Sequence, residues 1–143
     1  MELKNKLKYS LSVMGQLKKL IVINIIFFVL PLLLNTFFWL LKLEDINLID
    51  YFVVEADLMS LIFKPWSLIT YGFLHGSFSH LFWNMIMLFY FGNILVNYFG
   101  DKRLLNVFFN GILFGGIIYI ISYNLFPVFT GVSSKMIGSS AGV

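Results

Sequence analysis

The sequence contains no cysteine and few charged residues, and both absences narrow what the protein can be. Without cysteine there is no disulfide framework, no thiol nucleophile and no thiolate-bound metal. Charged residues make up 12% of the 143 residues, about half of the roughly 25% found in soluble domains. The mean hydropathy is +0.89. A chain this poor in charge cannot cover a soluble surface, so we predict an integral membrane protein.

Three long apolar segments predict three membrane-spanning helices. A helix needs about 20 apolar residues to cross the hydrocarbon core, and residues 20–41, 78–99 and 104–126 satisfy that length. Residues 138–143 have the composition of the opening of a fourth helix. We therefore predict an all-α, polytopic transmembrane bundle with three full spans and the start of a fourth.

The positions of lysine and arginine predict the orientation. Five of the ten basic residues lie before residue 20, and two more follow the second span. Because cytoplasmic segments are enriched in Lys and Arg, we expect residues 1–19 to be a basic cytoplasmic arm. The arm is either an amphipathic surface helix or an unstructured segment. Residues 20–143 then form the membrane domain, and the simple lysine-rich arm favours a bacterial inner membrane. Nothing indicates the exposed basic stripe of a nucleic-acid-binding protein.

The loops at 42–65 and 127–137 fall on the same, outer face of the membrane in this topology. The first loop carries five acidic residues together with apolar clusters at 51–54 and 58–63. A solvated linker does not need such clusters. We therefore expect a structured loop with short helices in the membrane interface.

Polar side chains at the outer end of the second span need an explanation, because an unpaired polar group is costly in hydrocarbon. His80 and Asn84 are four residues apart and share one helix face. Ser140 lies at the same depth, in the string Gly138-Ser139-Ser140-Ala141-Gly142. No strand precedes this string, so the nucleophile elbow of soluble hydrolases is excluded. Two neutral donors beside a serine match an oxyanion hole next to a nucleophile.

Each of these features also has a purely structural interpretation. Strings of glycine, serine and alanine are common where helices pack closely, and the G-x-x-x-G of Gly111 and Gly115 is interpreted in that way. A histidine and an asparagine within a span often form interhelical hydrogen bonds. The coincidence of both features at one membrane face favours a catalytic role.

Together these residues resemble the rhomboid intramembrane serine proteases over about residues 66–143. The family's H-x-x-x-N motif, which supplies oxyanion donors, is matched by His80 and Asn84. Its G-x-S motif is matched at residues 138–140, with Ser140 in the position of the nucleophile. Five further positions support the match: Gly138, Ser139, Gly142, His75 and Trp66.

The resemblance implies an intramembrane serine endopeptidase that cleaves transmembrane segments of membrane proteins, within the lipid bilayer and without metal or cofactor. Two departures stand out. The family's arginine after the tryptophan is Ser67 here, and the family's base histidine lies on a sixth span. The chain ends at Val143 and has only His75 and His80. We therefore expect the N-terminal portion of a rhomboid, inactive by itself.

Two other functions remain open. An inactive rhomboid-like protein would bind transmembrane helices without using Ser140. A small transporter or channel subunit would line its pathway with asparagines such as Asn84, Asn93 and Asn97. Other intramembrane proteases fit poorly, because the sequence has no H-E-x-x-H zinc motif and no aspartate within a predicted span.

Overall fold

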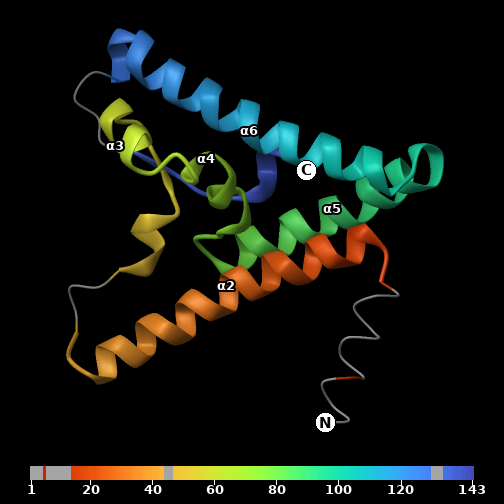
Figure 1. Cartoon of the computed structure of the whole chain (residues 1–143), viewed down its shortest axis with the longest axis horizontal. Coiled ribbons are helices and arrows are strands. Elements are labelled where there is room, and N and C mark those ends of the chain that lie inside the picture. Colours follow the sequence, from red (N-terminus) through yellow and green to blue (C-terminus); the bar gives the residue numbers. More distant parts are fainter. Residues whose placement is uncertain (1–4, 6–13, 44–46, 130–133) are drawn as a thin grey trace.

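The computed structural model describes residues 5, 14–43, 47–129 and 134–143. Three helices in these segments are long and apolar enough to cross a bilayer: α2 (Gln16–Leu40), α5 (Phe78–Phe99) and α6 (Asp101–Leu125) (Figure 1). The predicted fold class, a helical membrane bundle, is confirmed. The predicted opening of a fourth helix is a single 3-10 turn, η4 (Ser139–Ala141).

Helix α2 begins at Gln16, before the predicted start at residue 20, and continues through Pro31. Its buried residues all lie in its first half: Leu17, Leu20 and Asn24. Figure 1 shows the second half diverging from α5, and large apolar side chains there, such as Leu33 and Trp39, are exposed. The predicted basic arm lies mostly outside the described residues.

Helices α5 and α6 are joined by a tight one-residue turn and splay apart from it (Figure 1). The side chain of Ser77 caps α5 by accepting a hydrogen bond from the His80 amide. Gly100, at φ +81, turns the chain directly into α6, which therefore starts at Asp101 rather than at the predicted residue 104. Helix α6 stops at Leu125, because Phe126 is extended before Pro127.

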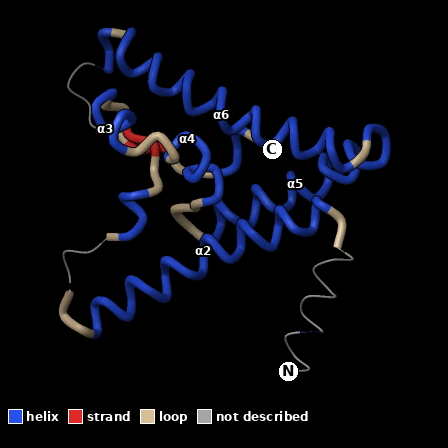
Figure 2. Tube along the Cα trace, in the orientation of Figure 1, coloured by secondary structure: helices blue, strands red, loops and turns tan. Residues whose placement is uncertain are grey.

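The first loop is structured, as predicted. It contains a 3-10 turn η1 (Leu48–Tyr51), strand β1 (Val54–Glu55) and helix α3 (Leu58–Phe63), and it continues into α4 (Ser67–Thr70) and the 3-10 turn η2 (Tyr71–Phe73). Another 3-10 turn, η3 (Pro127–Phe129), follows α6. The sequence did not predict the two strands that appear in red beside α3 and α4 in Figure 2.

Strand β1 pairs antiparallel with β2 (Lys135–Met136), so that Val54 faces Met136 and Glu55 faces Lys135. The pairing brings together two segments about 80 residues apart in the sequence, as expected for loops on one membrane face. Lys135 also forms an ion pair with Asp50, with 2.6 Å between Nζ and Oδ1. The first loop therefore holds the segment that leads directly into residues 138–143. The expectation that no strand precedes this segment is wrong, because β2 ends two residues before Gly138. The two-residue strand leads into a 3-10 turn, however, and not into the helix of a nucleophile elbow.

The buried core lies where the first half of α2 meets α5, α6 and η2. Phe73 of η2 is at its centre, with its ring 5.7 Å from those of Phe27 and Phe108. Further core residues come from all three long helices: Leu17, Leu20, Leu88, Leu104, Ile112 and Ile120. This core includes η2 and the middle of α6, the two elements that pack against η4 (Figure 1).

Candidate active site

The first two turns of α5 carry the two predicted donors. The cap by Ser77 fixes the start of the helix, so His80 and Asn84 project from successive turns of one face. Asn84 is buried, and its Nδ2 has no hydrogen-bond partner among the described residues. A buried amide donor without a partner costs free energy and is available to an oxygen that arrives with a substrate.

Gly138 lies directly against these two side chains. A Cβ on this residue would be 2.6 Å from Cε1 and 2.8 Å from Nε2 of His80, and 3.8 Å from Nδ2 of Asn84. Its φ of +123 is a conformation that favours glycine. Its amide donates a 3.0 Å hydrogen bond to the carbonyl of Tyr71. Only glycine therefore allows the chain to pass over the His80 ring at this point.

The next residues form the turn η4, in which Ser139 and Ser140 have opposite environments. Ser139 is completely buried, and its Oγ lies 3.2 Å from Nε2 of His75. Ser140 is exposed. The amide of Gly142 closes the turn with a 2.8 Å hydrogen bond to the Ser139 carbonyl. The turn thus presents the hydroxyl-bearing side chain of Ser140 on its open side.

Helix α6 contacts the other side of the turn through small residues. The carbonyl oxygen of Ala141 lies against Gly111, and a Cβ on Gly115 would be 2.5 Å from Cβ of Ala141. A Cβ on Gly142 would be 2.6 Å from the carbonyl oxygen of Phe108. The G-x-x-x-G of α6 is therefore a packing surface, as predicted, and its partner is the serine turn.

Tyr71 connects these elements, although no motif in the sequence pointed to it. It is fully buried. Its hydroxyl donates a 2.6 Å hydrogen bond to the Ile112 carbonyl, and its own carbonyl accepts from Gly138. The residue thus joins the segment before His75 to α6 and to the G-x-S motif. A tyrosine preceding a loop is too common a feature to have been recognised from sequence.

His75 lies between the tyrosine and α5 and is almost fully buried, at 6% exposure. Its ring is edge-on to that of His80, with 5.2 Å between the centroids. Burial, reinforced by the neighbouring His80, lowers the pKa of His75 to about 4. The ring is therefore neutral at physiological pH.

Trp66 contacts the first loop rather than the serine turn. Its Nε1 donates a 2.9 Å hydrogen bond to the carbonyl of Tyr51. Ser67, where the family has arginine, is buried in α4. A nearby interaction of the same loop joins Lys64 to Glu55 at 3.2 Å. Trp66 therefore supports the loop.

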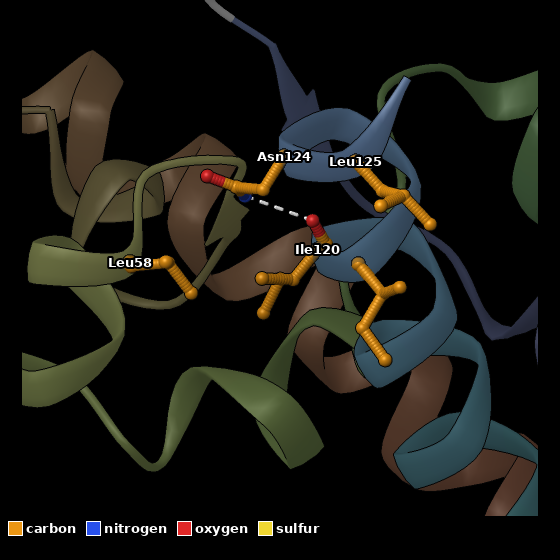
Figure 3. A pocket seen from close by; sticks show the side chains of 5 residues that line it. Leu58, Ile120, Asn124 and Leu125 are labelled. Carbon is orange, nitrogen blue, oxygen red and sulfur yellow. Dashed lines mark hydrogen bonds between the residues drawn. The ribbon is translucent and has the colours of Figure 1, made fainter.

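A cavity of about 270 Å³ lies away from the serine turn, between α3 and the end of α6 (Figure 3), and it is lined by Leu58, Ile120, Ile121, Asn124 and Leu125. The Nδ2 of Asn124 donates hydrogen bonds to the carbonyls of Ala56 and Ile120, so this polar group of the cavity wall already has partners. Over the described segments, no three His, Asp or Glu side chains gather as a metal site requires.

Sequence comparison identifies the family of this chain. The family profile described as Rhomboid domain matches residues 63–142, more than half of the chain. The chain belongs to the rhomboid family. No curated protein matches it closely enough to inform its function. The rhomboid match includes α5, α6 and the serine turn, and leaves out α2 and most of the first loop.

The structure of this rhomboid brings most of the selected residues together. His80 and Asn84 border Gly138, His75 contacts Ser139, and Gly142 packs on α6. Trp66 hydrogen-bonds outside the serine turn. Ser140 is exposed on the turn, two residues after Gly138, and Gly138 borders the half-buried His80 and the buried Asn84.

Proposed function

We propose that this rhomboid is an intramembrane serine endopeptidase in which Ser140 is the nucleophile and His80 and Asn84 stabilise the oxyanion. The observation that carries the proposal is the contact of Gly138 with both donor side chains. It supports a position for Ser140, two residues further along, at the edge of the same donor group. The substrates would be transmembrane segments of other membrane proteins.

In this mechanism the Oγ of Ser140 attacks the carbonyl carbon of the scissile peptide bond, and its proton passes to a base. The oxyanion that forms accepts hydrogen bonds from His80, Asn84 and the Ser140 amide. Collapse of the intermediate expels the amine, which takes the proton from the protonated base. Water then hydrolyses the acyl-serine. Each oxyanion donor is worth roughly 10²–10³ in rate.

The base is the part of the mechanism that the described residues do not supply. His75 contacts Ser139, and His80 contacts Gly138. Within the described segments neither ring is hydrogen-bonded to Ser140. The resemblance to the family assigns the base to a histidine on a later span. We therefore expect the 143 residues by themselves to be inactive.

The test is Ser140-dependent chemistry in the full-length gene product, reconstituted in liposomes with a model transmembrane substrate. We expect cleavage and labelling by a fluorophosphonate probe, both abolished by Ser140→Ala and retained by Ser79→Ala. Ser79 is an exposed serine on the first turn of α5. Cleavage that survives Ser140→Ala would refute the role assigned to Ser140.

A second candidate function is a rhomboid-like protein that binds transmembrane helices without cleaving them. The observation in its favour is that both histidines of the chain are engaged with residues other than Ser140. This candidate predicts that the full-length gene product binds a transmembrane peptide, that Ser140→Ala binds it equally well, and that neither cleaves it.

The excess of basic residues near the N-terminus supports a cytoplasmic N-terminus, with the serine turn near the outer face of the membrane. Because the chain has no cysteine, single cysteines placed at Asp50 and Lys102 report on topology without background. A membrane-impermeant thiol reagent should label position 50 and not position 102 in intact cells. The opposite pattern would reverse the orientation.

A further inference from the structure

The buried contact between Ser139 and His75 has no part in the mechanism above. Ser139 occupies the variable middle position of the G-x-S motif, yet it is completely buried, and its Oγ lies 3.2 Å from Nε2 of His75. A hydroxyl at a fully buried position is costly unless it is hydrogen-bonded. Alanine would fill the same space without that requirement, so the hydroxyl has a use that depends on His75.

The contact joins two segments 64 residues apart in the sequence. His75 belongs to the short connection between η2 and α5, and Ser139 opens η4. The backbone on either side of Ser139 is the part that matters for catalysis. Gly138 lies against His80 and Asn84, and Ser140 carries the exposed hydroxyl. The buried Ser139 side chain thus lies between Gly138, which borders the donors His80 and Asn84, and Ser140, the proposed nucleophile.

The other anchors of the turn restrain different degrees of freedom. The amide of Gly138 is held by the Tyr71 carbonyl at 3.0 Å, and Ala141 is held against α6 by steric contact. The peptide unit that carries the Ser140 amide includes the Ser139 carbonyl, which accepts the 2.8 Å hydrogen bond from the Gly142 amide. That bond holds the unit relative to the rest of the turn, but it does not tie the turn to α5. The side-chain hydrogen bond between Ser139 and the buried His75 ties the turn to the segment that leads into α5, at the residue immediately before the Ser140 amide.

We propose that Ser139 and His75 form a positioning pair that sets the Ser140 amide and hydroxyl against the oxyanion donors. The proposal rests on the function assigned to Ser140, and it adds two residues that act on the reaction only through Ser140. Without the hydrogen bond, the turn can move relative to His80 and Asn84. Because a misplacement of about 1 Å can cost on the order of 10²-fold in rate, kcat falls about 10- to 100-fold while KM changes little.

The hydrogen bond is tested first, independently of catalysis. The chain has two histidines, so a sample labelled with ¹⁵N-histidine in micelles gives two sets of ring signals, which His80→Gln assigns. We expect Ser139→Ala to move the Nε2 signal of His75 and to change the His80 signals less. Unchanged His75 signals in a folded Ser139→Ala variant overturn the proposal.

The geometry of the turn is tested with a pair of cysteines at positions 80 and 140 and a short bifunctional thiol reagent. The natural sequence contributes no cysteine. Adding Ser139→Ala should lower the crosslinking yield of this pair. A control pair at positions 17 and 92, where a Cβ on Gly92 would be 2.5 Å from Cδ1 of Leu17, should crosslink equally with and without Ser139→Ala. A turn pair that crosslinks equally well in both backgrounds contradicts the proposal.

The kinetic test uses the full-length gene product and a matched pair of substitutions at His75. The terminal amide of glutamine reaches the place of Nε2 and can donate to or accept from the Ser139 hydroxyl, whereas the amide of asparagine reaches only the place of Nδ1. We therefore expect His75→Gln to retain most of kcat, and His75→Asn to lose as much as Ser139→Ala. The double variant Ser139→Ala with His75→Asn should lose no more than either single variant.

Failure of this proposal differs from failure of the proposed function. Equal losses by the two His75 variants, or additive losses in the double variant, overturn the positioning pair while Ser140-dependent cleavage stands. If no variant cleaves and Ser140→Ala is indistinguishable from the natural chain, the proposed function fails. In that case the ring signals and the crosslinking still decide whether the pair exists and holds the turn.

Discussion

The serine turn is bordered by two surfaces of opposite character. On the α6 side, Gly111 and Gly115 meet the backbone and Cβ of Ala141, and the contact consists of shape alone. On the α5 side, His75, His80 and Asn84 meet residues 138 and 139 through polar groups, some of them without partners. The first surface fixes where the turn lies, and the second provides the chemistry. Substitutions on the two sides should therefore fail in different ways.

The largest effect is expected on the polar surface, from Asn84→Ala. Removing one oxyanion donor should lower kcat by roughly 10²–10³-fold, about 3–4 kcal/mol of transition-state stabilisation. KM and thermal stability should change little, because Nδ2 of Asn84 gives up no partner among the described residues. Cleavage kinetics of the full-length gene product measure it.

Asn93→Ala is the matched control for Asn84. It lies on the same helix, and its Nδ2 donates to the Phe89 carbonyl one turn away. It should leave kcat within the error of the natural enzyme. Equal losses at both positions would mean that Asn84 acts on the helix and not on the reaction.

The next largest effect is the pH dependence of stability that the buried ring of His75 causes. The pKa of His75 falls from 6.5 to about 4 on folding, so the unfolded chain binds more protons between these values. The free energy of unfolding should therefore decrease as pH falls from about 6.5 to about 4, by about 3 kcal/mol. The titratable neighbour that faces the ring is His80 of α5, whereas Ser139 of η4 does not titrate in this range.

His75→Gln should remove this part of the acid sensitivity, and His80→Gln should keep most of it. Denaturation in mixed micelles at a series of pH values measures the difference between each variant and the natural chain. Acidic groups that titrate in the same range cancel in that difference. Parallel curves for His75→Gln and the natural chain would contradict the assignment.

On the α6 side, Gly111→Ala is expected to cost less free energy than the changes above, but to affect both stability and activity. Overpacking costs about 1–3 kcal/mol, and here the added methyl meets the carbonyl of Ala141, which cannot move aside as a flexible side chain does. Both thermal stability and kcat should fall, in contrast to Asn84→Ala. Gly15→Ala is the control, because nothing lies within 4 Å of a Cβ there. A stable, fully active Gly111→Ala variant would show that the turn is not held by this contact.

The smallest effect is expected from the exposed ion pair that links the first loop to β2. Asp50→Asn should cost up to about 1 kcal/mol, because exposed pairs are screened by solvent and salt. The pair is about half exposed on both sides, and the β1–β2 pairing remains in place without it. Thermal denaturation at low and high salt measures the loss, and a loss several times larger would indicate that the loop depends on this pair.

The main features of the fold could be predicted from the hydropathy of the sequence, and the candidate residues could be predicted from its motifs. The span at 78–99 was predicted with its observed bounds, because apolar length and the flanking glycine and charges mark helix ends locally. The G-x-x-x-G surface of α6 was recognised for a similar reason. Its partner was not, because the spacing of small residues does not say which segment packs on them.

The amino-acid sequence by itself determined that the chain enters the membrane, how many spans are complete and which residues carry rhomboid motifs. These properties depend on hydropathy and on residue identity, which are local. Only the tertiary structure decided that Tyr71 and Gly138 are joined, that β1 pairs with β2, and that Ser139 rather than Ser140 contacts His75. The physical reason is that which of the two adjacent serines is buried depends on how the turn is seated, and the turn is seated by contacts with His75, 64 residues from Ser139, and with the glycines of α6.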